Sequence, residues 1–124
     1  MNRKIIFIDD YFDDQILGGG ELNNKELISL LDENKYQIEA INGEHVSRVF
    51  LEERKNDFFI ISNFVTLNEF NINFITKECE YLIYEHDHKY ISNRNPAPYK
   101  NFIAPSDKIR NFYFYKNAKR ILCQ

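Results

Sequence analysis

Lys4-Ile5-Ile6-Phe7-Ile8-Asp9 is a continuous apolar run that ends in an acid. Such a run is typical of a strand buried on both faces of a parallel sheet. Further strand patterns occupy residues 36–41, 58–62, 81–84 and 120–123, and helical patterns alternate with them at residues 21–34, 44–55, 67–77 and 105–118. The alternation predicts an α/β fold, a three-layer Rossmann-like domain with a parallel sheet of about five strands in the order 3-2-1-4-5.

Composition indicates a single globular domain over residues 1–124. The chain is 44% hydrophobic and 15% aromatic, which is enough for a packed core. No apolar run approaches the roughly 20 residues of a membrane span, and the start of the chain turns into a strand too early for a secretory signal. We therefore expect a cytoplasmic protein without a transmembrane segment, in which Cys79 and Cys123 are reduced thiols.

Charge is distributed unevenly along the chain, although the net charge is −3. Residues 89–124 hold eight basic residues and one acid, Asp107, interleaved with aromatic residues. A basic and aromatic segment is one form of nucleic-acid surface. Helical spacing of Ile109, Phe112 and Tyr113 behind Ser106, a candidate N-cap, instead predicts an amphipathic helix with solvated lysines on its other side. We expect no nucleic-acid partner.

The run Gly18-Gly19-Gly20-Glu21 holds three of the four glycines and precedes a helical pattern. Glycine lets a ligand approach the backbone, and a helix N-terminus presents free N–H groups and a partial positive charge to an anion. No Lys-Ser/Thr pair follows, as a P-loop requires, and eight residues separate these glycines from the first strand. The pattern therefore indicates anion binding without matching a standard nucleotide fingerprint.

The predicted strand order brings two segments to one crevice. Strands 1 and 4 would be neighbours at the switch point of the sheet, where ligands bind in doubly wound folds. The glycines follow strand 1, and Glu85-His86-Asp87-His88, the densest cluster of titratable groups, follows strand 4. Asn63 after strand 3 and Arg94 in the long segment 85–104 are candidates for the same crevice.

The cluster at residues 85–88 admits three uses. Its side chains suit acid/base chemistry, hydrogen bonding to a polyhydroxylated ligand, or metal binding. His86 and His88 alternate onto one side of an extended chain, but a metal would need a further ligand from elsewhere, such as Asp10 or Asp13. We expect no bound metal at this position.

Asp9-Asp10 after an apolar strand also suggests a response-regulator receiver, in which paired acids bind magnesium beside a phosphorylated aspartate at the end of strand 3. That place is taken here by Ser62-Asn63, and no lysine ends strand 5 in the required way. The sequence therefore disfavours a receiver.

Four segments together resemble the N-terminal domain of family 4 glycosyltransferases of the GT-B fold. They are the strand at residues 4–9, Gly18-Gly19-Gly20-Glu21, Tyr84-Glu85-His86-Asp87, and the stretch from Tyr115 to Gln124. The resemblance extends over the whole chain through short motifs, of which the glycine and glutamate element is the most specific. It implies one half of a GT-B architecture, which transfers a sugar from a nucleotide-sugar donor to a glycan or other acceptor.

The resemblance also implies roles for individual residues. Gly18, Gly19 and Gly20 would close over the donor diphosphate, and His86 would lie near the transferred sugar, with Asp87 a less secure catalytic candidate. Glu21, Asn63, His88 and Arg94 complete the expected substrate-binding set. No cofactor is implied beyond the nucleotide-sugar itself.

The sequence stops at Gln124 without the second, donor-binding domain of that family. We therefore expect a chain that is inactive alone and works with a separate donor-binding domain or by self-association. Two other functions stay open: a non-catalytic glycan- or phosphate-binding module, and a small metal-dependent hydrolase that uses His86, Asp87 and His88. The sequence does not select the donor sugar, the acceptor or the linkage.

Overall fold

The computed structural model describes residues 4–10, 19–34, 36–85 and 111–123. Five strands alternate with helices along this part of the chain, as predicted. The strands are β1 (Ile5–Asp9), β2 (Ile38–Asn42), β3 (Phe58–Ile61), β4 (Glu80–Glu85) and β5 (Arg120–Cys123). The α-helices are α1 (Gly19–Glu33), α2 (Arg48–Arg54), α3 (Glu69–Glu78) and α4 (Phe112–Lys116), and a short 3₁₀ helix, η1 (Gly43–His45), precedes α2. The predicted α/β, Rossmann-like class is confirmed.

The strands form one parallel sheet in the order β2-β1-β3-β4-β5. The predicted order 3-2-1-4-5 is wrong, because β3 lies between β1 and β4. The chain adds β2 on one side of β1 and then places β3, β4 and β5 on the other side. The switch point is therefore between β1 and β3. The expected crevice between the ends of strands 1 and 4 is corrected accordingly, since those two strands are not neighbours.

Burial along the strands explains this order. All five residues of β1 are buried, as an inner strand requires, whereas no residue of β2 is buried. Glu39 in the middle of β2 has an ion-pair partner outside the sheet, an arrangement suited to an edge. A half-polar second strand thus ends the sheet on that side, and the chain returns across β1 to place β3 on its other flank.

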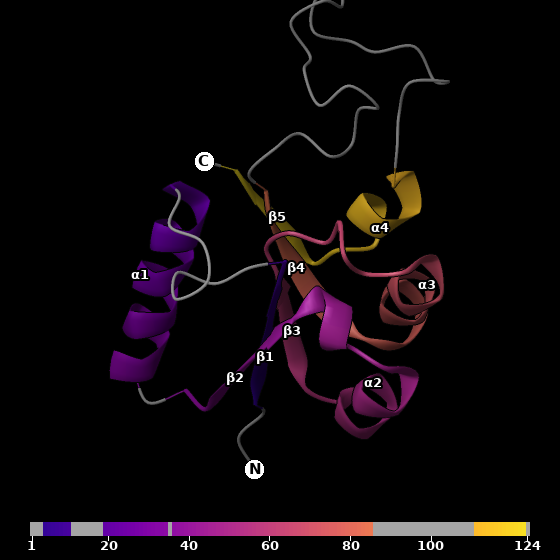
Figure 1. Ribbon diagram of the computed structural model, residues 1–124, viewed down its shortest axis with the longest axis horizontal. Helices are drawn as coiled ribbons and strands as arrows, with labels where there is room; N and C mark the ends of the chain where they lie inside the picture. The colour runs from indigo at the N-terminus through magenta and orange to yellow at the C-terminus, as the bar shows by residue number, and fades with distance from the viewer. Residues whose placement is uncertain (1–3, 11–18, 35, 86–110, 124) are drawn as a thin grey trace, which may run out of the picture.

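Helices cover both faces of the sheet. Figure 1 shows α1 alone on one face and α2, α3 and α4 on the other. Ile5, Phe7 and Ile60 form the core beneath α1, while Ile6 and Ile8 of the same strand belong to the larger core on the opposite face. Alternate side chains of β1 thus anchor two helical layers, the three-layer arrangement expected from the sequence.

Side-chain caps mark the starts of α2 and α3. Ser47 caps α2 by accepting a hydrogen bond from the Phe50 N–H, and Asn68 caps α3 in the same way. The helix expected at residues 105–118 is shorter in its described part. Asn111 has φ 58° and ψ 29°, so α4 begins only at Phe112. Residues 105–110, with the expected cap Ser106, lie outside the described part.

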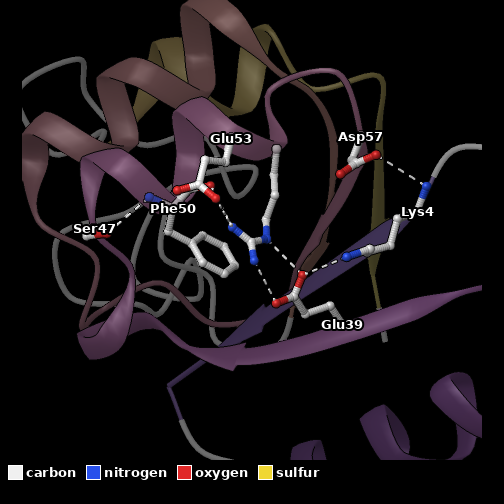
Figure 2. A network of polar contacts seen from close by, with 7 residues as sticks. Lys4, Glu39, Ser47, Phe50, Glu53 and Asp57 are labelled. Atoms are coloured by element: carbon white, nitrogen blue, oxygen red, sulfur yellow. Dashed lines mark hydrogen bonds and ion pairs between the residues drawn. The ribbon is translucent and has the colours of Figure 1, made fainter.

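A polar cluster joins β1, β2 and α2 at the end of the sheet where these strands begin (Figure 2). The Arg54 guanidinium donates two hydrogen bonds to the Glu39 carboxylate, at 2.8 and 3.1 Å, and lies 3.8 Å from the centre of the Phe50 ring. Lys4 Nζ donates to the same carboxylate at 3.2 Å. The hydrogen bonds from Arg54 lower the pKa of Glu39, and both cations stabilise its charged form. This cluster ties α2 to the sheet.

The surface of β5 is partly apolar. Ile121 and Leu122 are both 43% exposed. Within the described ranges, no helix combines the length and apolarity needed to cross a membrane.

Candidate functional site

A buried polar network lies at the switch point, where β1 and β3 end. The Asp9 carboxylate is fully buried and accepts hydrogen bonds from the side-chain amides of Asn24 and Asn63, the second at 3.0 Å. The Ser62 hydroxyl donates to the Asn24 side-chain oxygen at 3.0 Å. Three separate elements, β1, α1 and the end of β3, are thus joined through side chains that water does not reach. Buried polar groups in such a network hold one another in a fixed geometry.

Asp10 organises the loop that follows β3. Its carboxylate accepts hydrogen bonds from the Thr66 hydroxyl at 2.6 Å, the Thr66 N–H at 2.8 Å and the Val65 N–H at 3.3 Å. The Asn42 amide at the end of β2 donates to the Asp10 carbonyl at 3.0 Å. The ends of β1 and β2 and the β3–α3 loop are therefore fixed to one another around Asp10.

Gly43 permits this close packing. A Cβ atom added at this residue would lie 2.4 Å from Thr66 Oγ1 and 3.4 Å from the Leu67 nitrogen. The first distance is too short for any side chain, and the obstructing atom is the hydroxyl that Asp10 holds. Glycine is thus required here so that the loops after β2 and β3 can touch.

Asn63 carries an unused acceptor at the same edge. Its Nδ2 group donates a hydrogen bond to the Asp9 carboxylate. This contact fixes the orientation of the amide, because a carboxylate can accept hydrogen bonds but cannot donate them. Its Oδ1 atom is buried, and nothing in the structure donates a hydrogen bond to it within the part of the chain described. A buried acceptor without a donor costs about 1–3 kcal/mol. A ligand hydroxyl or amine that reached this atom would recover that cost. Asn63 thus lies at the edge of the sheet where β1 and β3 end, and its part in ligand binding stays a prediction.

The glycine segment begins α1. Gly19 and Gly20 are its first two residues, and Glu21 is the third, so the helix starts two residues before the predicted boundary. Asn24, in the next turn, fastens this part of α1 to the end of β1. A helix start is therefore held close to the switch point, as the anion-binding interpretation requires. Gly18 lies outside the described residues.

Four of the predicted site residues, His86, Asp87, His88 and Arg94, also lie outside the described residues. β4 ends at Glu85, and its C-terminal end lies at the same edge of the sheet as those of β1 and β3. One inner strand, β3, separates β4 from β1.

Metal-ligating groups do not gather among the described residues. In those ranges, no three histidine, cysteine or carboxylate side chains are placed to hold a metal ion. Both carboxylate oxygens of Asp10, an expected candidate ligand, accept hydrogen bonds from the β3–α3 loop. Asp13 lies outside the described ranges. Burial raises the pKa of the half-buried Cys79 thiol to about 11, so this thiol is neutral at physiological pH.

The geometry at Asp9, Asp10 and Asn63 bears on the receiver alternative. Asp9 and Asn63 are in contact at the ends of neighbouring strands, as the acid pair and the phosphorylated residue of a receiver would be. The residue at the end of β3 is nevertheless an amide that donates to Asp9, and an amide provides no carboxylate oxygen for phosphorylation. The structure thus gives a physical reason for the sequence argument against a receiver.

Sequence reasoning did not anticipate the parts played by Asn24, Ser62 and Thr66. Asn24 lies among polar residues in the first half of a helix, and nothing in its neighbours distinguishes it from a solvated residue. Ser62 had a usable signal, because a small polar residue directly after the apolar run of β3 occupies the edge where ligands bind. Thr66 depends on a contact 56 positions away along the chain, which no local pattern carries.

Comparisons of the chain with protein families, with curated proteins and with solved structures found no match. The interpretation of the site therefore depends on its own geometry.

Proposed function

We propose that the chain is a glycosyltransferase-like domain that binds a sugar-containing ligand at the edge of the sheet where β1 and β3 end. The observation that supports this most directly is the joining of a glycine-led helix to the switch point through Asp9, Asn24 and Ser62. Ligands of doubly wound folds bind at this position.

The described polar groups favour hydroxyl groups over a bare anion at the switch point itself. Asp9 and Asp10 are carboxylates, and the free atom of Asn63 is a carbonyl oxygen. The two carboxylates repel a phosphate through their negative charge, and the free Asn63 oxygen accepts a hydrogen bond, which a sugar hydroxyl can donate. The start of α1 has the opposite preference, because helix N-termini attract phosphate groups. A nucleotide-sugar, with a diphosphate next to a sugar ring, satisfies both preferences.

The resemblance to family 4 glycosyltransferases supplies the remaining roles in the proposal. Gly18, Gly19 and Gly20 lie against the diphosphate, and His86 contacts the transferred sugar, with Asp87 beside it. Glu21, His88 and Arg94 complete the site. Catalysis takes place with a donor-binding domain or a second copy of the chain, in the cytoplasm, and without a cofactor.

The partner in this proposal would pack against strand β5. Ile121 and Leu122 are neighbours on strand β5, at the edge of the described sheet, and project to opposite faces, each 43% exposed. Another domain or a second copy that packed on either face would cover one of them.

A non-catalytic binding module is the second candidate, and one observation favours it. Both carboxylates at the switch point are committed to hydrogen bonds that hold the fold together. Neither is therefore a free general base, which must reach the proton it removes. In this alternative the same edge binds a glycan or a phosphate ester without transferring a sugar.

Calorimetry of the purified chain with UDP-glucose, GDP-mannose and UDP tests the proposal. We expect saturable binding of at least one nucleotide-sugar, and an affinity loss of about tenfold or more in Gly19→Val, because a β-branched side chain obstructs the approach of phosphate to the backbone. Ser29→Val, at an exposed position of the same helix, is the matched control and should bind as the parent does.

Two results would contradict the proposal: no binding of any of these compounds, or equal binding by Gly19→Val and the parent. Assaying sugar transfer in the same samples separates the two candidates, since the module binds and does not turn over.

A further inference from the structure

A groove of about 410 Å³ is lined by residues of α3 and α4. Figure 1 shows these two helices on the sheet face opposite α1. The groove shares no residue with the network at the switch point. Its lining consists of Asn73, Thr76 and Lys77 from α3 and of Tyr113 and Asn117 from α4 and its C-cap. The volume is in the lower part of the range of small-molecule sites, about 300–1,000 Å³.

The α4 side of the groove is firmly anchored. Phe114 is buried, with its ring stacked on Tyr81 at 5.0 Å between centroids and edge-on to Phe64 at 4.9 Å. The Tyr81 hydroxyl donates to the Phe114 carbonyl at 2.6 Å. The next residue back, Tyr113, is 69% exposed. A large aromatic ring is thus presented to solvent from a short helix that a buried aromatic cluster holds in place, which lowers the entropic cost of using it for binding.

The polar groups of the groove are divided between acceptors and donors. The Thr76 hydroxyl donates to the Ile72 carbonyl at 2.7 Å, and the Asn117 amide donates to the Tyr113 carbonyl at 2.8 Å. The Asn117 side-chain oxygen is left to accept a hydrogen bond from a ligand, whereas the Thr76 hydroxyl also interacts with the Tyr81 hydroxyl. Within the described part of the chain, the side chains of Asn73 and Lys77 form no hydrogen bond or ion pair, so their donors are available.

We propose that this groove binds an acidic sugar, a uronic acid residue of a glycan. The ring of the sugar packs against Tyr113, its carboxylate pairs with Lys77, and its hydroxyls exchange hydrogen bonds with Asn73 and Asn117. The balance of charge selects this class, because the described lining of the groove offers one cation, Lys77, which matches one carboxylate but leaves a diphosphate mostly unpaired. An apolar peptide is a poor occupant, because it would remove water from the polar groups of the groove without forming hydrogen bonds with them.

The proposal is tested by following the backbone amide signals of the labelled chain during titration with methyl β-glucuronide, and with methyl β-glucoside as the uncharged counterpart. We expect saturable shifts at Asn73, Lys77, Tyr113 and Asn117, and an affinity about threefold to fivefold higher for the glucuronide at low salt. In Lys77→Gln the preference for the glucuronide over the glucoside should disappear, since glutamine is polar but carries no charge.

Tyr113→Ala should weaken both compounds by about tenfold through loss of the aromatic surface. Phe70→Ala is the matched control, because Phe70 is an exposed aromatic residue of α3 that does not line the groove. It should leave both affinities unchanged. Equal affinity for the two sugars would overturn the assignment to acidic sugars, and shifts confined to other residues or no saturation would overturn the site itself. Neither result depends on nucleotide-sugar binding at the switch point.

Discussion

At the residue scale, the described part of the switch point depends on pairs of polar side chains that have no access to water. Asn24 is the centre of this arrangement, since its amide donates to Asp9 and its oxygen accepts from Ser62. A buried asparagine in a helix is favourable only when both of its polar atoms are paired, and here they are. The same residue that fixes α1 to the sheet therefore also sets the position of the glycine-led helix start.

Replacing Asn24 with alanine should lower the free energy of unfolding by about 1–3 kcal/mol, because Asp9 loses a donor and Ser62 loses an acceptor inside the fold. Urea denaturation followed by circular dichroism measures this change. Asn34→Ala, at the residue that directly follows α1, is the control, since Asn34 is exposed, and it should change stability by less than about 0.5 kcal/mol. Equal effects of the two substitutions would mean that the buried network adds no stability.

Glu39 should make folding dependent on pH. Its pKa is lowered in the folded state, chiefly by the hydrogen bonds from Arg54, so its contribution is complete above the pKa of an unfolded glutamate and is lost as pH falls through the folded pKa. Stability should therefore decline below about pH 4.3 partly through this group. Because the side chain is partly exposed, the effect is less than about 1 kcal/mol.

Comparing the pH profiles of stability of Glu39→Gln and the parent checks this contribution. The difference between the two should shrink as the pH falls. Glu52→Gln provides the control, because the Glu52–Arg48 pair is well exposed. A difference that stays constant from neutral to acidic pH would exclude the ion pair as its cause.

At the element scale, the loops after β1, β2 and β3 act as one unit. Asp10 bonds to the β3–α3 loop, Asn42 bonds to Asp10, and Gly43 lies against Thr66. Glycine is needed at residue 43 for space and not for a positive φ, which no described glycine has.

Gly43→Ala should destabilise the fold by about 1–3 kcal/mol, because the new methyl group pushes the Thr66 hydroxyl away from Asp10. A double-mutant cycle with Thr66→Ala measures the coupling, and the second substitution should remove part of the cost of the first. Strictly additive effects would show that the two loops are not in contact as described.

The sequence was sufficient for the kinds and order of the elements but not for the arrangement of the strands. The apolar run of β1 and the alternation of strands and helices identified a parallel α/β sheet, because burial on both faces leaves a direct mark on composition. The sequence indicates only weakly on which side of β1 the strand β3 pairs. The one sign is the polar Glu39 in β2, which fits a strand at the edge of the sheet.

The candidate site was predictable to a similar degree. The position of Asn63 directly beyond β3 and the helix start at the glycines follow from the sequence, while the binding roles of these residues stay predictions. The bonds to Asn24 and Thr66 were not foreseen, because they join residues 15 and 56 positions apart through contacts that only the folded chain creates.

At the scale of the whole molecule, the two ends of the sheet have different chemistry. The end where the strands begin carries the paired charges of Lys4, Glu39 and Arg54, which satisfy one another (Figure 2). The opposite end carries the unused acceptor of Asn63 beside a glycine-led helix. This polarity leads us to place ligand binding at the second end only.

Mapping a nucleotide-sugar onto the chain by amide chemical-shift perturbation tests this central claim most directly. With UDP-glucose, the account predicts saturable shifts at Gly19, Gly20, Asn63 and Thr66, and unchanged signals at Lys4, Glu39 and Arg54. Shifts concentrated at the end where the strands begin, or saturation with no change at Asn63 and Gly19, would contradict it.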